Sequence, residues 1–204
     1  MKQQLMLKVF TILCSCCLLI GCSLKPLPAE VKNTYILSPA TTIVAVKAPT
    51  AATLLIARPR AAAGFDTGKM AYQTEDYKIA YFTENRWVDE PSQMLEPLLI
   101  EVLQRTKKFH AVVGMPYSGK ADFRLSTDLL QFQQNFMYNP SLAQLAIRVR
   151  LVDEHSEKVI ASRQFVVTAE APSNDPYGGV IALNQATQTF LKQLAQFVTA
   201  AVEN

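Results

Sequence analysis

Cysteine is absent from this 204-residue sequence after position 22. The four cysteines are Cys14, Cys16, Cys17 and Cys22, and the first three lie in a short apolar run near the start. A protein that begins at Cys22 has no second thiol for a disulfide and no thiolate cluster for a metal. We therefore expect burial of apolar side chains alone to hold the fold together.

Histidine is also scarce, because the sequence contains only His110 and His155. A Ser-His-Asp triad needs a base beside a nucleophile and an acid that orients the base. Neither histidine occurs in a nucleophile-elbow or zinc-site pattern, and the glycines form no phosphate-binding loop. We therefore predict no catalytic residue, no metal ligand and no cofactor, and we interpret the chain as not an enzyme.

A strong charge of one sign and a long apolar run are missing as well. The formal net charge is +3, and it falls to +1 when residues 1–21, which include Lys2 and Lys8, are removed. Such a balance does not indicate nucleic-acid binding. After residue 20, no apolar run reaches the roughly 18 residues of a transmembrane helix, so we expect no membrane-spanning segment there.

The start of the sequence has the pattern of a secretory signal. Residues 1–8 are basic, residues 9–20 form an apolar run too short to cross a bilayer, and the run ends in the letters LIGC at Cys22. LIGC resembles the bacterial lipoprotein signal called the lipobox. The resemblance implies cleavage before Cys22 and acylation of its thiol and new amino group by chains such as palmitate. The alternatives are a transmembrane anchor or a chance cysteine.

The residues after Cys22 bear on where the protein is sorted. In Gram-negative lipoproteins an Asp at the next position commonly retains the protein in the inner membrane, so Ser23 favours the periplasmic face of the outer membrane. Several acyl chains, at about 0.8 kcal/mol per buried methylene, anchor a protein stably. The following residues contain two prolines and no periodic pattern, which predicts an extended tether. The predicted organisation is a signal peptide at 1–21, a lipidated tether at 22–33 and one domain at 34–204.

Local patterns predict the first elements of the domain. The apolar run Leu54–Ile56 predicts a buried strand. Residues 61–77 contain two glycines and little periodicity, so we predict mostly loop. Residues 78–91 predict one strand, a turn at Glu84-Asn85 and a second short strand at 86–88.

An amphipathic helix is predicted between residues 91 and 108, where apolar residues recur with spacings of three and four. We expect Asp89 or Glu90 as its cap, with Pro91 in the first turn. Pro97 has no N–H to donate, so the helix either kinks there or begins its regular part there.

The C-terminal half shows long alternating patterns. The alternation in its second strand slips in phase, and a bulge near Leu129-Leu130 would bring both apolar sets to one face. The predicted elements are strands at 109–114, 121–138, 142–153 and 159–170, the last two as a hairpin, and a helix at about 177–202.

This order of elements predicts an α/β fold with a mixed, largely antiparallel sheet and two main helices on its apolar side. The strand–helix–strand step should cross over right-handed and pair in parallel, and the later strands should form an antiparallel meander. We find neither an internal repeat nor a second domain.

Several segments in order carry a family resemblance. They are YILSP after the tether, LLIARPR as the first strand, YFTENRWVDEPSQMLEPLLIEVLQRTKKFHAVV, ADFRLSTDLLQF and AIRVRLVDEHSEKVIASRQF. Over about residues 34–200 the chain resembles the ABC-type transport auxiliary lipoproteins, the group that includes PqiC; Pro97 departs from the pattern. The resemblance implies a domain like the N-terminal domain of TolB. It also implies work beside an ABC transporter and an MCE-domain protein that carry lipids between two membranes.

Two functions stay open at this point. The first is a non-catalytic accessory lipoprotein of such an ABC transporter and MCE system, and self-association into a homo-oligomer is left open. The second is a lipoprotein that itself binds a lipid or another hydrophobic ligand, which would need an apolar cavity between the helices and the sheet.

The candidate partner-binding residues are aromatic and basic. Trp87, the only Trp, could form an exposed patch with Tyr81 and Phe82, since such residues are common anchors at interfaces. The alternative is a core Trp that pins the strand before the helix. Arg148 and Arg150, on the polar face of the most regular strand, could meet an acidic partner or lipid headgroups, or they could form a solvated face.

Overall fold

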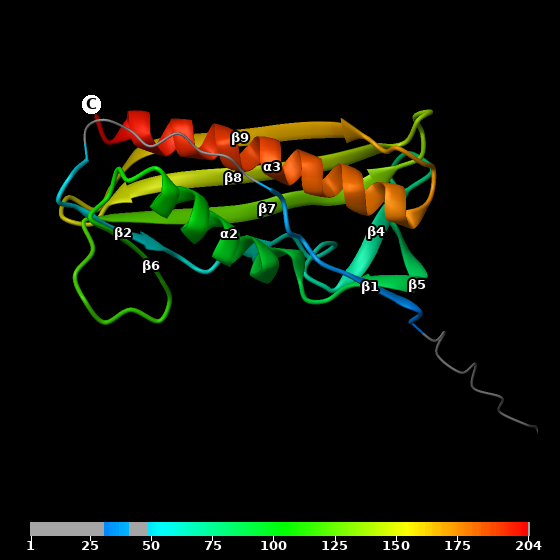
Figure 1. The fold of residues 1–204 in the computed structure, drawn as a ribbon, viewed down its shortest axis with the longest axis horizontal. Helices are drawn as coiled ribbons and strands as arrows, with labels where there is room; N and C mark the ends of the chain where they lie inside the picture. The colour runs from blue at the N-terminus through cyan, green and yellow to red at the C-terminus, as the bar shows by residue number, and fades with distance from the viewer. Residues whose placement is uncertain (1–30, 41–48, 204) are drawn as a thin grey trace, which may run out of the picture.

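The structure, a computed structural model, describes residues 31–40 and 49–203. The predicted signal peptide, Cys22 and most of the predicted tether lie outside the described residues. The elements are β1 (Asn33–Tyr35), β2 (Thr53–Ile56), β3 (Arg60–Ala61), β4 (Lys69–Gln73), β5 (Ala80–Trp87), α2 (Pro91–Arg105), β6 (Ala111–Gly114), β7 (Phe123–Asn135), β8 (Leu142–Asp153), β9 (Lys158–Glu170) and α3 (Pro176–Ala201). The strands form one nine-stranded sheet, and both helices lie over the same face of it (Figure 1).

The long strand β7 organises the sheet. Along one edge it pairs antiparallel with β8 over its whole length, and β9 continues the sheet antiparallel to β8. Along its other edge β7 pairs in parallel with three short strands in succession, β2, β3 and β4. Beyond these, β6 extends the sheet next to β2, while β5 and then β1 extend it next to β4. The predicted mixed sheet with two helices is confirmed, and the likeness to the TolB N-terminal domain stays a prediction.

The alternating patterns of the C-terminal half produce the buried face of the sheet. The register between β7 and β8 shifts between Leu129 and Gln131, which is the predicted bulge. The extra residue changes the phase of β7, so Leu125 before the bulge and Phe132 after it both point into the core. In β8 the predicted inward side chains are all buried: Ala143, Leu145, Ile147, Val149 and Leu151.

The two helices cover the apolar face of the sheet with their apolar stripes. Helix α3 packs against β8 and β9, and α2 packs against β6, β2 and β3. Helix α2 begins at Pro91 with Glu90 as its N-cap and continues through Pro97, so a regular helix that begins only at Pro97 is wrong. Both Pro97 and Gln93, whose carbonyl loses its partner, are exposed, so water can satisfy that carbonyl. Among the described residues, no helix has both the length and the hydropathy that a membrane span requires.

Three predictions for the first half of the domain need correction. Strand β4 lies where mostly loop was predicted, and β5 is one continuous strand across the predicted turn at Glu84-Asn85. Strand β1 holds that stretch extended, because Asn33 pairs with Asn85 and the Lys32 ammonium lies 2.9 Å from the Glu84 carboxylate. After α2 the chain does form a parallel pair, but β6 pairs with β2 and not with β5, the strand that precedes the helix.

Candidate functional site

Trp87 belongs to the core and not to a surface patch. It is the last residue of β5, is 1% exposed, and its ring centroid lies 5.4 Å from that of Phe132 on β7. Its backbone N–H donates to the carbonyl of Gly68 at 2.8 Å, which fixes the end of β5 against the start of β4. An exposed patch that includes Trp87 is therefore corrected, because the residue pins the strand before the helix.

Tyr81 and Phe82 do lie near the surface, but they have different neighbours. They are consecutive residues of β5, so their side chains leave opposite faces of the strand. The Tyr81 hydroxyl donates to the carbonyl of Gly64 at 2.9 Å. Phe82 stacks on Tyr72 with ring centroids 4.5 Å apart, and Phe136 lies edge-on to both. Both residues are half-buried, which leaves each of them partly accessible to a partner.

A hollow of about 430 Å³ opens between β4 and β5 beside these two aromatic residues. The register of the β4–β5 ladder shifts between Lys69 and Ala71, and this irregularity separates the start of β4 from the end of β5. Two exposed cations, Lys69 and Arg86, line the hollow, together with Tyr81 and Phe82. We call this feature the basic hollow. Its lining residues are Val31, Thr67, Gly68, Lys69, Tyr81, Phe82, Thr83, Asn85 and Arg86.

The charge and chemistry of the basic hollow suit an anionic group. None of its lining residues is acidic. The Lys69 ammonium lies 5.7 Å from the centroid of the Tyr81 ring, a cation–π contact. The Arg86 Nε donates to the carbonyl of Trp87 at 3.2 Å, which orients the guanidinium at the rim. An acidic side chain or a phosphate could therefore meet two cations and an aromatic face there.

Lys69 and Arg86 were not predicted from the sequence. They lie 17 positions apart, and the ladder between β4 and β5 places them opposite each other. A prediction of that pairing would have needed β4, which was taken for loop. The only local signal is the Lys-Met-Ala-Tyr-Gln run of β4, which places an exposed cation before two buried residues.

Arg148 and Arg150 lie on the face of the sheet that is opposite to the helices, and protein atoms already bind both. The Arg150 Nη2 lies 2.8 Å from Asp128 on β7, and Arg60 on β3 binds the other oxygen of the same carboxylate at 2.8 Å. The Arg148 Nη2 donates to Gln164 on β9 at 3.2 Å. These side chains tie neighbouring strands together, and the Asp128 cluster retains a net positive charge of one.

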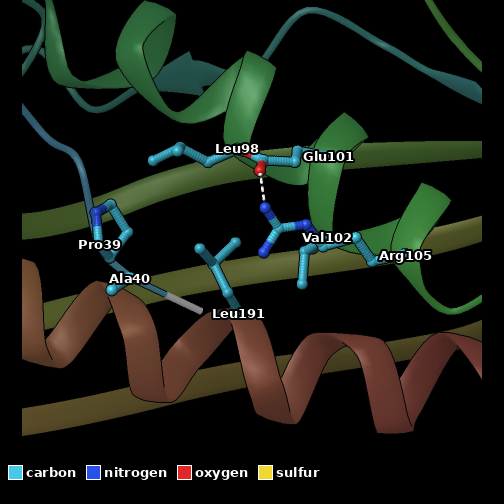
Figure 2. A pocket seen from close by; sticks show the side chains of 7 residues that line it. All are labelled: Pro39, Ala40, Leu98, Glu101, Val102, Arg105 and Leu191. Carbon is cyan, nitrogen blue, oxygen red and sulfur yellow. Dashed lines mark hydrogen bonds and ion pairs between the residues drawn. The ribbon is translucent and has the colours of Figure 1, made fainter. Parts of the chain in front are cut away.

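A second hollow lies between the two helices. Figure 2 shows Leu98 and Val102 of α2 facing Leu191 of α3, with the ion pair between Glu101 and Arg105 beside them. Its volume is about 260 Å³. That is below the roughly 300–1,000 Å³ of typical small-molecule sites, so this groove is small for a lipid chain.

The remaining candidate chemistry is dispersed over the surface. His110 is exposed at the start of the segment that leads into β6, and its backbone N–H donates to Ala52. His155 is exposed in the β8–β9 turn, with its Nε2 at 3.9 Å from the Asp122 carboxylate. Within residues 31–40 and 49–203, no three His, Cys, Asp or Glu side chains are grouped so that they could hold a metal ion.

Comparison with known proteins gives one family and a set of similar folds. The family model described as the ABC-type transport auxiliary lipoprotein component matches residues 35–195. Protein XCC0632 from Xanthomonas campestris, assigned to DUF330, has a similar structure with a TM-score of 0.75 and 20% identity. That match covers 83% of this chain and 98% of the other.

Two further solved structures share the fold. An uncharacterized protein matches with a TM-score of 0.65 and 16% identity, over 83% of this chain and 99% of its own. The hypothetical protein CT253 from Chlamydia trachomatis matches with a TM-score of 0.50 and 9% identity, over 74% of this chain and 99% of its own. At such low identities these structures support the fold alone. Among curated proteins, no match was found.

Proposed function

This chain belongs to the ABC-type transport auxiliary lipoprotein family, and from that membership we propose that it is a non-catalytic accessory subunit of an ABC transporter. Its partner is an MCE-domain protein, and the system moves lipids between the inner and outer membranes. The family match over residues 35–195 is the observation that carries this proposal. The small groove between the helices favours this role over that of a lipid carrier.

The proposal includes an anchor at the periplasmic face of the outer membrane. The letters LIGC at Cys22 support acylation of that residue, and Ser23 supports sorting to the outer membrane. Mass spectrometry of the protein from native envelopes tests the anchor, and we expect a triacylated Cys22 as the first residue. A retained leader, or an unmodified N-terminus elsewhere, would contradict it. Cys22→Ala should release the domain from membranes or leave the chain unprocessed.

We assign the contact with the partner to the basic hollow. Val31 lines it, and nine residues separate Val31 from Cys22, which span at most about 30 Å. The hollow therefore lies near the membrane that carries the anchor. Lys69 and Arg86 supply charge, and Tyr81 supplies the rigid aromatic surface that is common at interface hot spots. This combination fits an acidic side chain of a protein partner.

Photo-crosslinking in living envelopes tests this assignment. A photoreactive amino acid replaces Thr83, which lines the hollow and is exposed. We expect an adduct with an MCE-domain protein or a transporter subunit, and loss of that adduct when Lys69→Glu and Arg86→Glu are combined. Lys192→Glu, which reverses an exposed lysine on α3, is the matched control and should leave the adduct intact. An adduct that survives the double reversal would refute the role of the hollow.

Genetics tests the partnership itself. Deletion of this protein should weaken the outer-membrane barrier only in cells whose MCE system is intact. The same defect in cells that lack the MCE system would show that the two do not work together. Turnover of a substrate by the purified protein that disappears with His110→Ala or His155→Ala would refute the non-catalytic role.

A further inference from the structure

Strand β9 is a long free edge of the sheet. Within the described part of the chain it pairs only with β8, and it contains 13 residues and no proline. Val159, Ile160 and Val166 are 55%, 42% and 67% exposed. The other outer strands, β1 and β6, have three and four residues. A long, exposed edge with unpaired backbone groups is a template for another strand, and proteins usually protect such edges.

We propose that β9 pairs antiparallel with β9 of a second copy of this chain, about a two-fold axis that passes beside Gln164. The two nine-stranded sheets then continue into one another. This is an isologous interface, in which the same surface of both copies must be complementary to itself. The inference does not depend on the proposed transport function.

The charges of β9 select this register. Lys158 begins the strand and Glu170 ends it, and Gln164 is its central residue. With the axis at Gln164, Lys158 lies opposite Glu170 of the partner subunit, and the same pair forms again at the other end. Opposite charges that face each other across two strands attract, and like charges there repel.

The neighbouring registers are less favourable. A shift of the axis by one residue toward the N-terminus places Arg163 directly opposite its own copy, so two cations face each other. A shift by one residue toward the C-terminus leaves Lys158 with no residue of β9 opposite it. In the proposed register, Arg163 instead lies opposite Phe165 of the partner subunit. Arg163 already lies over an aromatic ring in its own subunit, with its guanidinium carbon 4.8 Å from the centroid of Phe165.

The symmetry also places the helices correctly. A two-fold axis perpendicular to the sheet keeps the helices of both copies on the same side, and α3 runs along β9 in each copy (Figure 1). Between α3 and β9 lies a groove of about 560 Å³, whose lining includes Ile160, Arg163 and Phe197. The second copy would cover this groove and its exposed apolar side chains, which adds buried apolar area to the strand pairing.

Charge exchange tests the register. The full-length lipoprotein, purified in detergent, is analysed by sedimentation equilibrium, and we expect a dimer. Lys158→Glu or Glu170→Lys alone turns two attractive contacts into two repulsive ones and should weaken dimerisation by about thirtyfold. The combined exchange of both residues should restore it. Lys69→Glu, at the far side of the sheet, is the control and should have no effect.

Cysteine crosslinking tests the axis in the membrane. Gln164 is exposed, and residues that lie directly opposite in an antiparallel pair have Cβ atoms about 4.5–5.5 Å apart. Gln164→Cys should therefore give a disulfide-linked dimer in envelopes, above the background of the unaltered chain. Thr83→Cys should not. A protein that stays monomeric, a dimer that is indifferent to both single charge exchanges, or no disulfide at Gln164→Cys would overturn the proposal.

Discussion

The start of helix α3 offers a test in which the structure and the sequence predict opposite signs. Gly178 lies in the first turn of α3, is buried, and its N–H donates to the Asp175 carboxylate at 2.7 Å. A Cβ atom at this position would lie 2.1 Å from the backbone carbonyl oxygen of Ser173 and 2.6 Å from its Oγ. Real Cβ contacts are never this short, so Gly178→Ala forces the backbone before the helix to move.

The two opposing effects have different sizes. Helix propensity alone favours Ala over Gly by about 1 kcal/mol, so the sequence predicts a more stable protein. An overpacked site costs about 1–3 kcal/mol, and the cost here should reach the upper end because the obstacle is backbone. The net loss should be about 2 kcal/mol. For a domain of this size, that corresponds to a fall in Tm of about 4–8 °C.

The assay is thermal unfolding of a fragment of residues 31–204, followed by circular dichroism. Thr189→Ala is the matched control because Thr189 is exposed on the same helix, and it should gain a few tenths of a kcal/mol from propensity. If Gly178→Ala raises the Tm in the same way, the chain does not pass this close to the helix and the reasoning fails.

Other consequences follow from the same fold. The fragment of residues 31–204 should melt in one cooperative transition that a chelator leaves unchanged, and a zinc-dependent Tm would contradict this. Trp87→Ala should cost about 3–5 kcal/mol in denaturant unfolding, because it empties a site packed against Phe132; a loss below about 1 kcal/mol would argue against burial. Asp175→Ala should cost about 1 kcal/mol at pH 7 by removing the cap of α3. Hydrogen bonds from the Gly178 N–H and then from Ser173 hold the Asp175 pKa below its ordinary 3.8. Its contribution is therefore complete above pH 3.8 and lost as the pH falls through the lowered value, whereas Asp175→Asn should keep the cap without that loss.

The elements predicted most accurately are those whose pattern is local and long. Strand β8 buries every second side chain over its length, so its bounds and its buried face both follow from the alternation. The slip in the alternation of β7 located the bulge at Leu129–Gln131, since one extra residue is the only way to bring both apolar sets to one face.

The short strands could not be predicted in this way. Strand β4 has five residues, and its burial does not alternate, because Met70 and Ala71 are buried in succession. It is extended because β7 and β5 hold it on either side, and no local pattern encodes that. Strand β5 crosses Glu84-Asn85, a pair that favours turns, because pairing with β1 overrides the local preference.

The candidate site was predicted in part for the same reason. Tyr81 and Phe82 were singled out by type, and both lie at the basic hollow. Trp87 was grouped with them by its position in the sequence, but the alternation of β5 and its contact with Phe132 place it in the core. The two cations of the hollow come together only through a tertiary ladder.

The two proposed surfaces lie at different edges of one sheet, and this arrangement allows both to be used at once. The basic hollow lies between β4 and β5, next to β1, whereas β9 is the edge beyond β8. The strands β7 and β8 separate them, so a second copy on β9 does not cover Lys69 or Arg86. A two-fold axis perpendicular to the sheet places the two β1 strands at the outer ends of the joined sheet. Because the axis relates the two copies, it also places Val31 of both at the same height along that axis. Two lipid anchors can then reach one membrane only if the axis is close to the membrane normal, which turns the joined sheet flat toward the bilayer and leaves one hollow open at each end.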